Sequence, residues 1–456
     1  MAKAKKIVAN DARSIAFQVL CRVEDGAYSD LALDGALDAM PDLDRRERGL
    51  ATQLVYGVLR RRGNLDHILA AYCRQSLAKL EPQALCLLRL GVYQLFYLDK
   101  VPRRAAVHST VELARQMGLE RVTGLVNGIL RSCIREPQRV KWPDADVDPI
   151  GWLTHYGSLP CWLAKRWLNE FGGEEAGLLA KAMLQVPPVT LRVNTLKIDR
   201  DAFIEKLAKA DIVARATRFA PEGVVIESGQ LRLLSVDDTT LYQIQDEASM
   251  LIAHLLAPKA GDRVLDACSA PGGKTTHLAA LSNNRAEIAA LDLHQKRLTL
   301  VQQSAERLGC TSITTHPWDM TQPCSLFPKE HFDRVLVDAP CSGLGVLRRN
   351  PESRWRRGEK DVCRLAKLQR KILVQAAELV APGGLLLYSL CTTTAEESKQ
   401  VVESFLAQHT DFKQEDLRSS SPDHWAELFD EQGRLSTLTT YHDGMDCFFA
   451  VALRRK

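Results

Sequence analysis

The sequence has 456 residues, 46% hydrophobic and 25% charged, which indicates a globular chain long enough for several domains. No run of about 18 apolar residues occurs, and no apolar signal core follows the basic first ten residues. We therefore expect a cytoplasmic protein without membrane contact. The 12 cysteines are scattered singly, with no spacing that suits zinc, so we expect reduced thiols and no metal. The net charge is +4, and a basic amino-terminal part favours a polyanionic partner.

The first 140 residues are predicted to form an α-helical domain. Apolar residues recur there at three- and four-residue intervals, as in RSIAFQVLCRV and PQALCLLRLGVYQLFYL. A linker rich in proline and acid, EPQRVKWPDADVDP, follows. Between residues 150 and 235, helical patterns are mixed with the short strands of PPVTLRVNTLK, VVIES and LRLLSV. This part is predicted to be a small α+β insert that binds RNA.

Residues 236–456 show a regular alternation of short apolar strands and helices. The strands lie in DRVLDAC, AEIAALDL, SITTHPWD, FDRVLVDAP and GGLLLYSLC. Such alternation is typical of an α/β domain whose parallel sheet is covered by helices on both faces. Ligands of these sheets bind beyond the carboxyl ends of the strands. All the candidate chemistry of this chain falls at those ends.

A turn after the first of these strands, DACSAPGGKTTHL, is a candidate ligand site. Cys268 stands where a phosphate-binding P-loop needs its first glycine, which disfavours an NTPase. The bare backbone of the Pro-Gly-Gly turn still allows a ligand to approach closely. Four successive strands end in acids: Asp266, Asp292, Asp319 and Asp338. A single strand-end Asp is most often a helix cap, whereas four beside a glycine turn favour a nucleoside cofactor. The lack of a basic cluster for pyrophosphate favours S-adenosylmethionine over NAD or ATP.

Two strands end close to a thiol, Cys341 after DRVLVDAP and Cys391 after GGLLLYSL. A buried cysteine is usually a packing residue. Beside a methyl-donating cofactor, however, a thiolate that adds to carbon 6 of a pyrimidine makes carbon 5 nucleophilic enough to accept a methyl group. That reaction needs a thiol, a donor to the ring and a proton acceptor. Cys391, Cys341, Asp338 and Lys274 supply these group types, but the residues alone leave open which thiol attacks.

The stretches DACSAPGGKT, VDAPCSGLGVLRRNPESRW and YSLCT closely resemble the signature motifs of the RNA cytosine-5 methyltransferases of the NOL1/NOP2/Sun family. VYGVLRRRGNLDHIL and LVNGILR are similar to a NusB-type RNA-binding domain. The resemblance implies an all-α NusB-like domain, the α+β insert, and a carboxy-terminal Rossmann-like class I methyltransferase domain that uses S-adenosylmethionine. It also implies 16S ribosomal RNA as partner, and we expect a monomer.

The resemblance assigns the attacking thiol to Cys391 and release of the methylated product to Cys341, with Asp338 and Lys274 beside them. Two departures from the family's pattern are Leu390, where threonine is common, and Ser398. The cofactor residues that it implies are Cys268, Ser269, Ala270, Pro271, Gly272, Gly273, Lys274, Asp292, Asp319 and Asp338.

The basic segment LRRNPESRWRRGEK follows Cys341 closely and is predicted to contact RNA phosphates, with stacking of a base on Trp355. The alternative is a solvated basic loop. The residues predicted to bind RNA are Arg348, Arg349, Arg354, Trp355, Arg356 and Arg357. A transfer-RNA methyltransferase and a non-catalytic RNA-binding factor remain the alternative functions.

Overall fold

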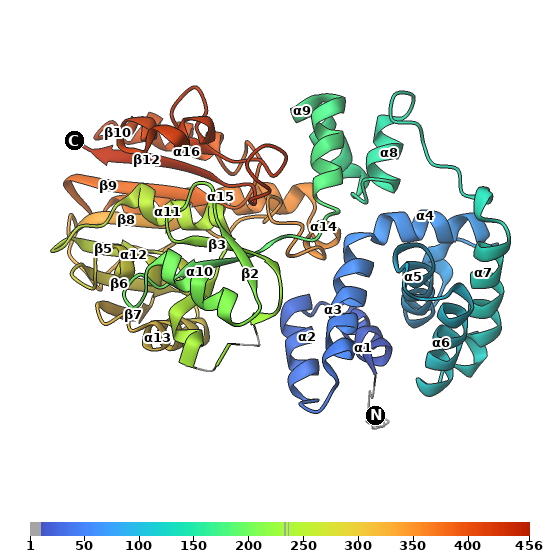
Figure 1. Cartoon of the computed structure of the whole chain (residues 1–456). Helices are drawn as coiled ribbons and strands as arrows, with labels where there is room; N and C mark the ends of the chain where they lie inside the picture. The colour runs from blue at the N-terminus through green and yellow to red at the C-terminus, as the bar shows by residue number, and fades with distance from the viewer. Residues whose placement is uncertain (1–10, 232–233, 236) are drawn as a thin grey trace. The chain divides into compact units, whose positions relative to one another are not determined.

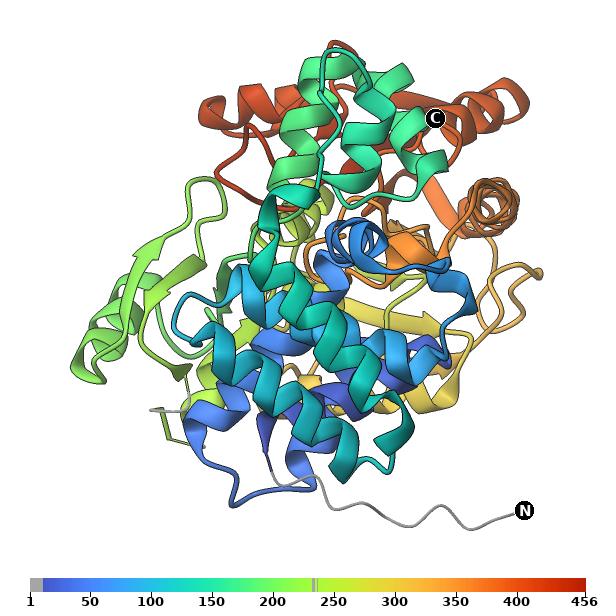
Figure 2. The same ribbon diagram turned by 90° about the vertical axis from the view of Figure 1, so that its right-hand side faces the viewer.

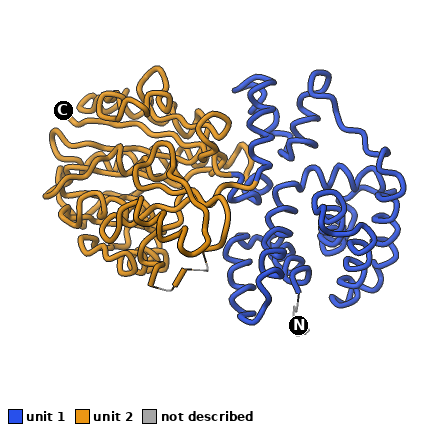
Figure 3. The backbone as a smooth tube through the Cα atoms, in the orientation of Figure 1, with its two compact units in different colours: residues 1–185, 347–356 blue, residues 186–346, 357–456 orange. Residues whose placement is uncertain are grey.

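The computed structural model describes residues 11–231, 234–235 and 237–456, so the basic first ten residues lie outside it. The chain divides into two compact units (Figure 3). Unit 1 holds residues 1–185 and 347–356, and unit 2 holds residues 186–346 and 357–456. No helix in the described residues combines the length and hydropathy needed to span a bilayer. The expected domain limits at residues 140, 150, 235 and 236 stay a prediction.

Unit 1 contains the predicted amino-terminal helices, which pack around one continuous apolar core (Figures 1 and 2). The core is built from the side chains that recur every three or four residues, such as Ile15, Val19 and Val23 of the first helix. Asp11 caps that helix because its carboxylate accepts a hydrogen bond of 2.8 Å from Ser14 N. The helices are α1 (Ala12–Glu24), α2 (Ser29–Asp38), α3 (Arg45–Arg60), α4 (Arg62–Tyr72), α5 (Pro82–Tyr97), α6 (Arg103–Gln116) and α7 (Thr123–Arg135).

Two further helices of unit 1 follow the linker, α8 (Pro149–His155) and α9 (Cys161–Ala182). Asn64 of α4 ties α8 to the amino-terminal helices, because its side-chain amide donates to the carbonyls of His155 and Tyr156 at 2.8 and 2.7 Å. The short helix α14 (Ser353–Arg356) comes from far along the chain and also belongs to unit 1.

Unit 2 begins with a four-stranded antiparallel sheet in the order β2-β3-β1-β4. Its strands are β1 (Val189–Val193), β2 (Val213–Ala216), β3 (Gly223–Ser228) and β4 (Tyr242–Ile244), and helix α10 (Arg200–Lys209) connects β1 to β2. Leu191, Val193 and Phe203 lie in the core between the sheet and this helix. The prediction of an α+β insert is confirmed, although β2 and β4 were not foreseen. The expected strand LRLLSV lies partly outside the described residues.

The larger sheet of unit 2 has the order β10-β12-β9-β8-β5-β6-β7, with β11 paired to β12 (Figure 1). Neighbouring strands from β9 to β7 in this order pair in parallel. Strand β12 pairs antiparallel with β9, and β10 pairs antiparallel with β12. The parallel part confirms the predicted Rossmann-like fold. The strands are β5 (Arg263–Asp266), β6 (Glu287–Asp292), β7 (Ile313–Pro317), β8 (Phe332–Asp338), β9 (Val380–Leu390), β10 (Phe412–Glu415), β11 (Leu435–Ser436) and β12 (Phe449–Arg455).

Helices cover both faces of this sheet. Successive residues of β8 face opposite ways, so Leu336 joins one apolar core and Val337 the other. Helices α11 and α12 contribute to the first core, and α15 and α16 to the second. The helices are α11 (Glu247–Leu256), α12 (Gly273–Leu281), α13 (Gln295–Leu308), α15 (Glu359–Ala377) and α16 (Lys399–Gln408). Because β6 lies on one side of β5 and β8 on the other, the strand order reverses at β5, which opens a ligand crevice at the carboxyl ends.

Candidate active site

The two strand-end thiols meet: Sγ of Cys341 and Sγ of Cys391 lie 3.3 Å apart. Their strands β8 and β9 are parallel neighbours, and Asp338 is in register with Ser389. Each thiol follows its strand end within a few residues, so both reach the same edge of the sheet. Gly345 fixes the loop after Cys341 by donating its N–H to the carbonyl of Cys391 at 3.0 Å. A side chain at Gly345 would collide with the carbonyl of Cys447, which explains why glycine stands there.

A half-buried ion pair lies beside the thiols, with the side chains of Lys274 and Asp338 13% and 28% exposed. The ammonium of Lys274, at the start of α12, is 2.7 Å from the carboxylate of Asp338, which also accepts a hydrogen bond of 2.8 Å from Ser389 Oγ. Burial disfavours the charged form of Lys274, but the charge and hydrogen bond of Asp338 outweigh it, with a further contribution from Cys391, so the pKa of Lys274 is raised. Lys274 therefore keeps its positive charge beside Cys391.

The two thiols have different electrostatic surroundings. The hydrogen bond with Cys391, followed by burial, raises the pKa of Cys341 well above its usual range, and the negative charge of Glu397 contributes in the same direction. Cys341 is thus the member of the pair that retains its proton, and its S–H can donate to the sulfur of Cys391. The structure gives the pair one protonated thiol and one thiol close to a cation.

Glu397 organises both thiol-bearing loops, and sequence reasoning did not select it. Its carboxylate is fully buried and accepts hydrogen bonds from Ser342 N at 2.8 Å, Ser342 Oγ at 2.5 Å and Thr394 Oγ1 at 2.7 Å. Gln369 Nε2 donates to it from α15 at 3.0 Å. Ser342 follows Cys341 directly, and Thr394 lies in the loop after Cys391, so one carboxylate fixes the spacing of the two loops. The only sequence signal was an acid beside Ser398, in a stretch that departs from the family's pattern.

The turn after β5 forms a cradle at the switch point of the sheet. Asp266 is 1% exposed, and its Oδ2 accepts from Thr275 Oγ1 at 2.7 Å, whereas its Oδ1 has no hydrogen-bond partner among the described residues. Burial is the main cause that raises the pKa of Asp266 to about 7. Gly272 has φ +104°, and a Cβ there would lie 3.0 Å from Val301 Cα, so only glycine fits the turn that starts α12. An unpartnered acceptor beside bare backbone is suited to hold a polar ligand.

The other strand-end acids differ in their surroundings. Asp292 is buried; it accepts a hydrogen bond from His294 N at 2.9 Å and forms an ion pair of 3.1 Å with Arg297. Asp319 is half-buried and caps a turn, since it accepts from N and Oγ1 of Thr321 at 2.9 and 2.7 Å. Both acids therefore have a structural task, and each carboxylate retains further acceptor capacity.

The predicted RNA-binding segment is largely a structural part of unit 1. Arg354 is 0% exposed, and its guanidinium donates to the carbonyls of Ser158, Met183 and Leu347 at 3.1–3.2 Å. Arg348 is 4% exposed. Phosphate contacts by these two arginines are contradicted by their burial, because a guanidinium enclosed by protein cannot meet RNA.

Two other members of that segment are also committed to packing. Trp355 is half-buried and donates from Nε1 to the carbonyl of Leu59 at 3.3 Å. Arg356 donates to the carbonyls of Val23, at 2.7 Å, and Ala27. The expected stacking of a base on Trp355 is therefore not supported by its surroundings. Arg349 and Arg357 remain predicted RNA-binding residues, and both are half-buried.

Comparison with known families divides the chain into three matched segments. Residues 10–135 match the NusB family, and residues 159–231 match the ferredoxin-like domain of RsmF/B-like methyltransferases. Residues 253–454 match the model of the 16S rRNA methyltransferases RsmB/F.

Similar proteins span almost the whole chain. A probable ribosomal RNA small subunit methyltransferase B from Bacillus subtilis is 39% identical, over 97% of this chain and 98% of its own. The ribosomal RNA small subunit methyltransferase B of Pseudomonas putida is 34% identical, over 92% and 95%. Among solved structures, NSun6 from Pyrococcus horikoshii with SFG covers 65% of this chain and 98% of its own, with a TM-score of 0.58 at 24% identity, which shows a shared fold.

Proposed function

Because the chain belongs to the RsmB/F family of 16S rRNA methyltransferases, we propose that it methylates carbon 5 of a cytosine in 16S ribosomal RNA through a covalent adduct with Cys391. The observation that carries the proposal is the pair of thiols 3.3 Å apart, one of them beside the Lys274–Asp338 ion pair. A core role for both thiols would not call for a half-buried ammonium and carboxylate next to them.

S-adenosylmethionine is the cofactor of this family, and when bound it supplies the methyl group. The residues present fit it, because the Gly272 turn, the unpartnered Oδ1 of Asp266 and the buried carboxylate of Asp292 lie at successive strand ends of one crevice. In our proposal, Asp292 accepts hydrogen bonds from the ribose hydroxyls, and Asp319 meets the adenine. The segment from Cys268 to Gly273 provides the backbone surface on which the cofactor lies.

We assign the attack on carbon 6 of cytosine to Cys391. Formation of the sulfur–carbon bond moves the ring electrons to carbon 5, which then takes the methyl group. Lys274 places a positive charge beside Cys391 in this step. Asp338 holds Lys274 in place and is itself positioned by Ser389. In our proposal, Lys274 and Asp338 together act on the thiolate and on the N3 and O2 side of the ring.

Release of the product requires removal of the carbon 5 proton, after which the bond between carbon 6 and the Cys391 sulfur breaks. We assign this step to Cys341. Its hydrogen bond with Cys391 is the main reason that its pKa is high. In our proposal, Cys341 gives its S–H proton to solvent after Cys391 has become a thioether, and the Cys341 thiolate then accepts the carbon 5 proton. The same surroundings keep Cys341 from competing as a nucleophile before the adduct forms.

The RNA is expected to meet this site with its target cytosine out of the stack, which costs a few kcal/mol and least in a loop or bulge. We propose that Arg349 and Arg357 contact phosphates and that the NusB-like helices add a second RNA-binding surface. The protein is proposed to act as a cytoplasmic monomer.

Methylation of 16S ribosomal RNA by the purified full-length chain tests the proposed function. With isotope-labelled S-adenosylmethionine, nucleoside mass spectrometry should find the label in 5-methylcytidine, and bisulfite sequencing should place it at one position. Cys391→Ala should give none. A label in another modified nucleoside, or full methylation by Cys391→Ala, would contradict the proposal. Cofactor binding without any RNA product would favour a non-catalytic RNA-binding factor.

A further inference from the structure

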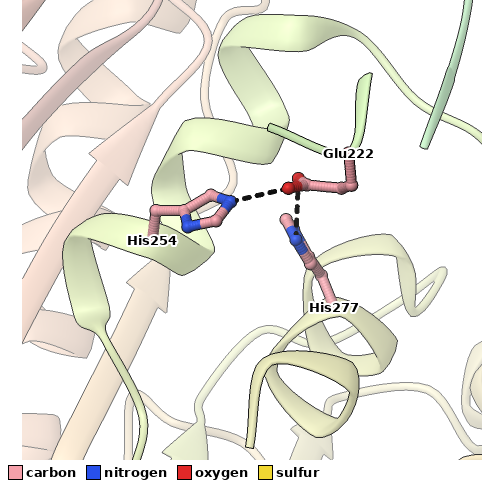
Figure 4. Close-up of side chains that lie close together, drawn as sticks. All are labelled: Glu222, His254 and His277. Carbon is pink, nitrogen blue, oxygen red and sulfur yellow. Dashed lines mark hydrogen bonds and ion pairs between the residues drawn. The ribbon is translucent and has the colours of Figure 1, made fainter. Parts of the chain in front are cut away.

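Three ionisable side chains converge inside unit 2, away from the thiols and outside the chemistry described above. Glu222 lies in the turn before β3, His254 on α11 and His277 on α12. Figure 4 shows the carboxylate of Glu222 between the two imidazole rings. Its Oε2 is 2.9 Å from His254 Nε2, and its Oε1 is 2.9 Å from His277 Nε2. Segments far apart in the sequence thus bring two imidazoles and one carboxylate to one point.

The hydrogen bonding of this cluster is incomplete. His277 is 1% exposed, and neither of its ring nitrogens has a hydrogen bond of acceptable geometry within the described part of the chain. Oε1 of Glu222 is likewise without one, although it lies 2.9 Å from His277 Nε2. A buried polar atom without a partner costs about 1–3 kcal/mol, so the cluster has a vacant bonding capacity in the protein interior.

A neighbouring cation, Arg192, does not supply the missing hydrogen bonds of Glu222 and His277. Arg192 is buried and within electrostatic reach of Glu222 and His277. Its guanidinium donates to Gln245 Oε1 at 2.6 Å, to Thr276 Oγ1 at 2.9 Å and to the carbonyl of Gly273. The carboxylate of Glu222 therefore faces the two histidines.

We propose that Glu222, His254 and His277 form a binding site for one divalent transition-metal ion of the zinc type. Two imidazoles and one carboxylate are a ligand set that zinc accepts, with water as the fourth ligand. All three ligand atoms lie within 4.8 Å of one another, against about 3.4 Å in a tetrahedral site with bonds near 2.1 Å. A shift of about 0.7 Å by each of two ligand atoms closes that difference of about 1.4 Å.

The position of the site indicates a structural task. His277 lies three residues after Lys274 on α12, the helix that begins at the cofactor turn, and Glu222 belongs to the small antiparallel sheet. A bound ion would join that sheet and α11 to α12 and thereby hold the cofactor turn in place.

Metal binding by the full-length chain tests this inference, with Zn²⁺ and Co²⁺ as probes after removal of metal by a chelator. We expect stoichiometric binding, a rise in melting temperature with Zn²⁺, and Co²⁺ absorption bands without a thiolate-to-metal charge-transfer band. Glu222→Gln and His254→Ala should lose the bound ion and the rise in melting temperature. The half-buried His254 makes its variant the one expected to fold without difficulty.

Two control variants separate this site from others. His316→Ala removes a histidine of β7 outside the cluster, and Cys341→Ser with Cys391→Ser removes the two active-site thiols. Both controls should bind the ion as the unchanged chain does. The inference is overturned if the wild-type protein binds no ion at stoichiometric concentration, or if Glu222→Gln and His254→Ala both bind the ion as well as the wild type does. It is also overturned if the double serine variant of Cys341 and Cys391 loses the bound ion. In each case the cluster is only a polar contact within the core.

Discussion

Replacement of Glu397 should separate the support of the active site from its chemistry. Glu397→Ala removes the acceptor for Ser342 N, Ser342 Oγ, Thr394 Oγ1 and Gln369 Nε2, all inside the protein. The two hydroxyls can find other partners, and Gln369 Nε2 keeps its hydrogen bond of 2.9 Å to the carbonyl of Pro340. The N–H of Ser342 and the second N–H of the Gln369 amide lose theirs. At about 1–3 kcal/mol for each buried donor left unpaired, we expect the free energy of unfolding to fall by about 3 kcal/mol. Urea denaturation measures this.

Glu397→Gln is the matched comparison, because its amide has nearly the same shape and its oxygen can still accept from Ser342 N. Its NH₂ group can donate to the hydroxyls of Ser342 and Thr394, so the loss should be only about 1 kcal/mol. Methyl transfer should accordingly fall much further in Glu397→Ala than in Glu397→Gln. Glu403→Gln, at an exposed glutamate of α16, controls for the loss of one negative charge.

The two Glu397 variants also report on the pKa of the Cys341 thiol. Since the charge of Glu397 is among the causes that raise the pKa of Cys341, Glu397→Gln should lower that pKa, and alkylation of Cys341 should become faster at a given pH. Peptide mass spectrometry with iodoacetamide measures the rate at this residue. An unfolding free energy of Glu397→Ala within about 1 kcal/mol of the unchanged chain, together with an unchanged alkylation profile, would refute the role given to this carboxylate.

Three further predictions concern other parts of the molecule. Asp292→Ala should weaken S-adenosylmethionine binding by about 10- to 100-fold in calorimetry, because a buried acceptor is lost, and unchanged affinity would remove Asp292 from the cofactor site. The pKa of Asp266 is raised in the folded state from 3.8 to about 7, so the cofactor-free protein should lose up to about 4 kcal/mol of stability as pH rises from about 4 to 7. Asp266→Asn should remove most of this slope, and an equal slope in urea titrations would contradict the assigned cause. Arg354→Met should lower the free energy of unfolding by about 2–4 kcal/mol, because three buried carbonyls lose their donor. Arg357→Gln should leave stability unchanged and flatten the salt dependence of RNA binding. A destabilised Arg357→Gln and a stable Arg354→Met with weaker RNA binding would contradict both roles.

Much of the fold could be predicted because its signals are local. The runs that became β5, β6, β8 and β9 are short, apolar and bounded by turn residues, and the helices between them show the 3.6-residue period. Parallel strands place their carboxyl ends at one edge, so a thiol after each of two strands was enough to expect that Cys341 and Cys391 lie close together. The antiparallel strands β10 and β12 were not predicted, because the sequence before them near the end of the chain shows no regular hydrophobic pattern.

The errors arose where long-range packing decides the environment of a charge. A segment rich in arginine is solvated in most proteins, but Arg354 finds its carbonyl partners on segments more than a hundred residues away, which no local pattern reveals. Glu397 was overlooked for the same reason, since its importance depends on the loop of Ser342. The cluster of Glu222 with two histidines likewise has no spacing that a metal motif would show.

The covalent adduct is the most direct test of the central claim, that Cys391 attacks and Cys341 releases. Each single variant is incubated with S-adenosylmethionine and 16S ribosomal RNA, and denaturing electrophoresis then detects protein bound to RNA. Cys341→Ala should accumulate an adduct that survives denaturation, because attack and methylation proceed while release is slow. Cys391→Ala and the double variant should give none. A stable adduct from Cys391→Ala with none from Cys341→Ala would reverse the assignment, and no adduct from any variant would contradict covalent catalysis by this pair.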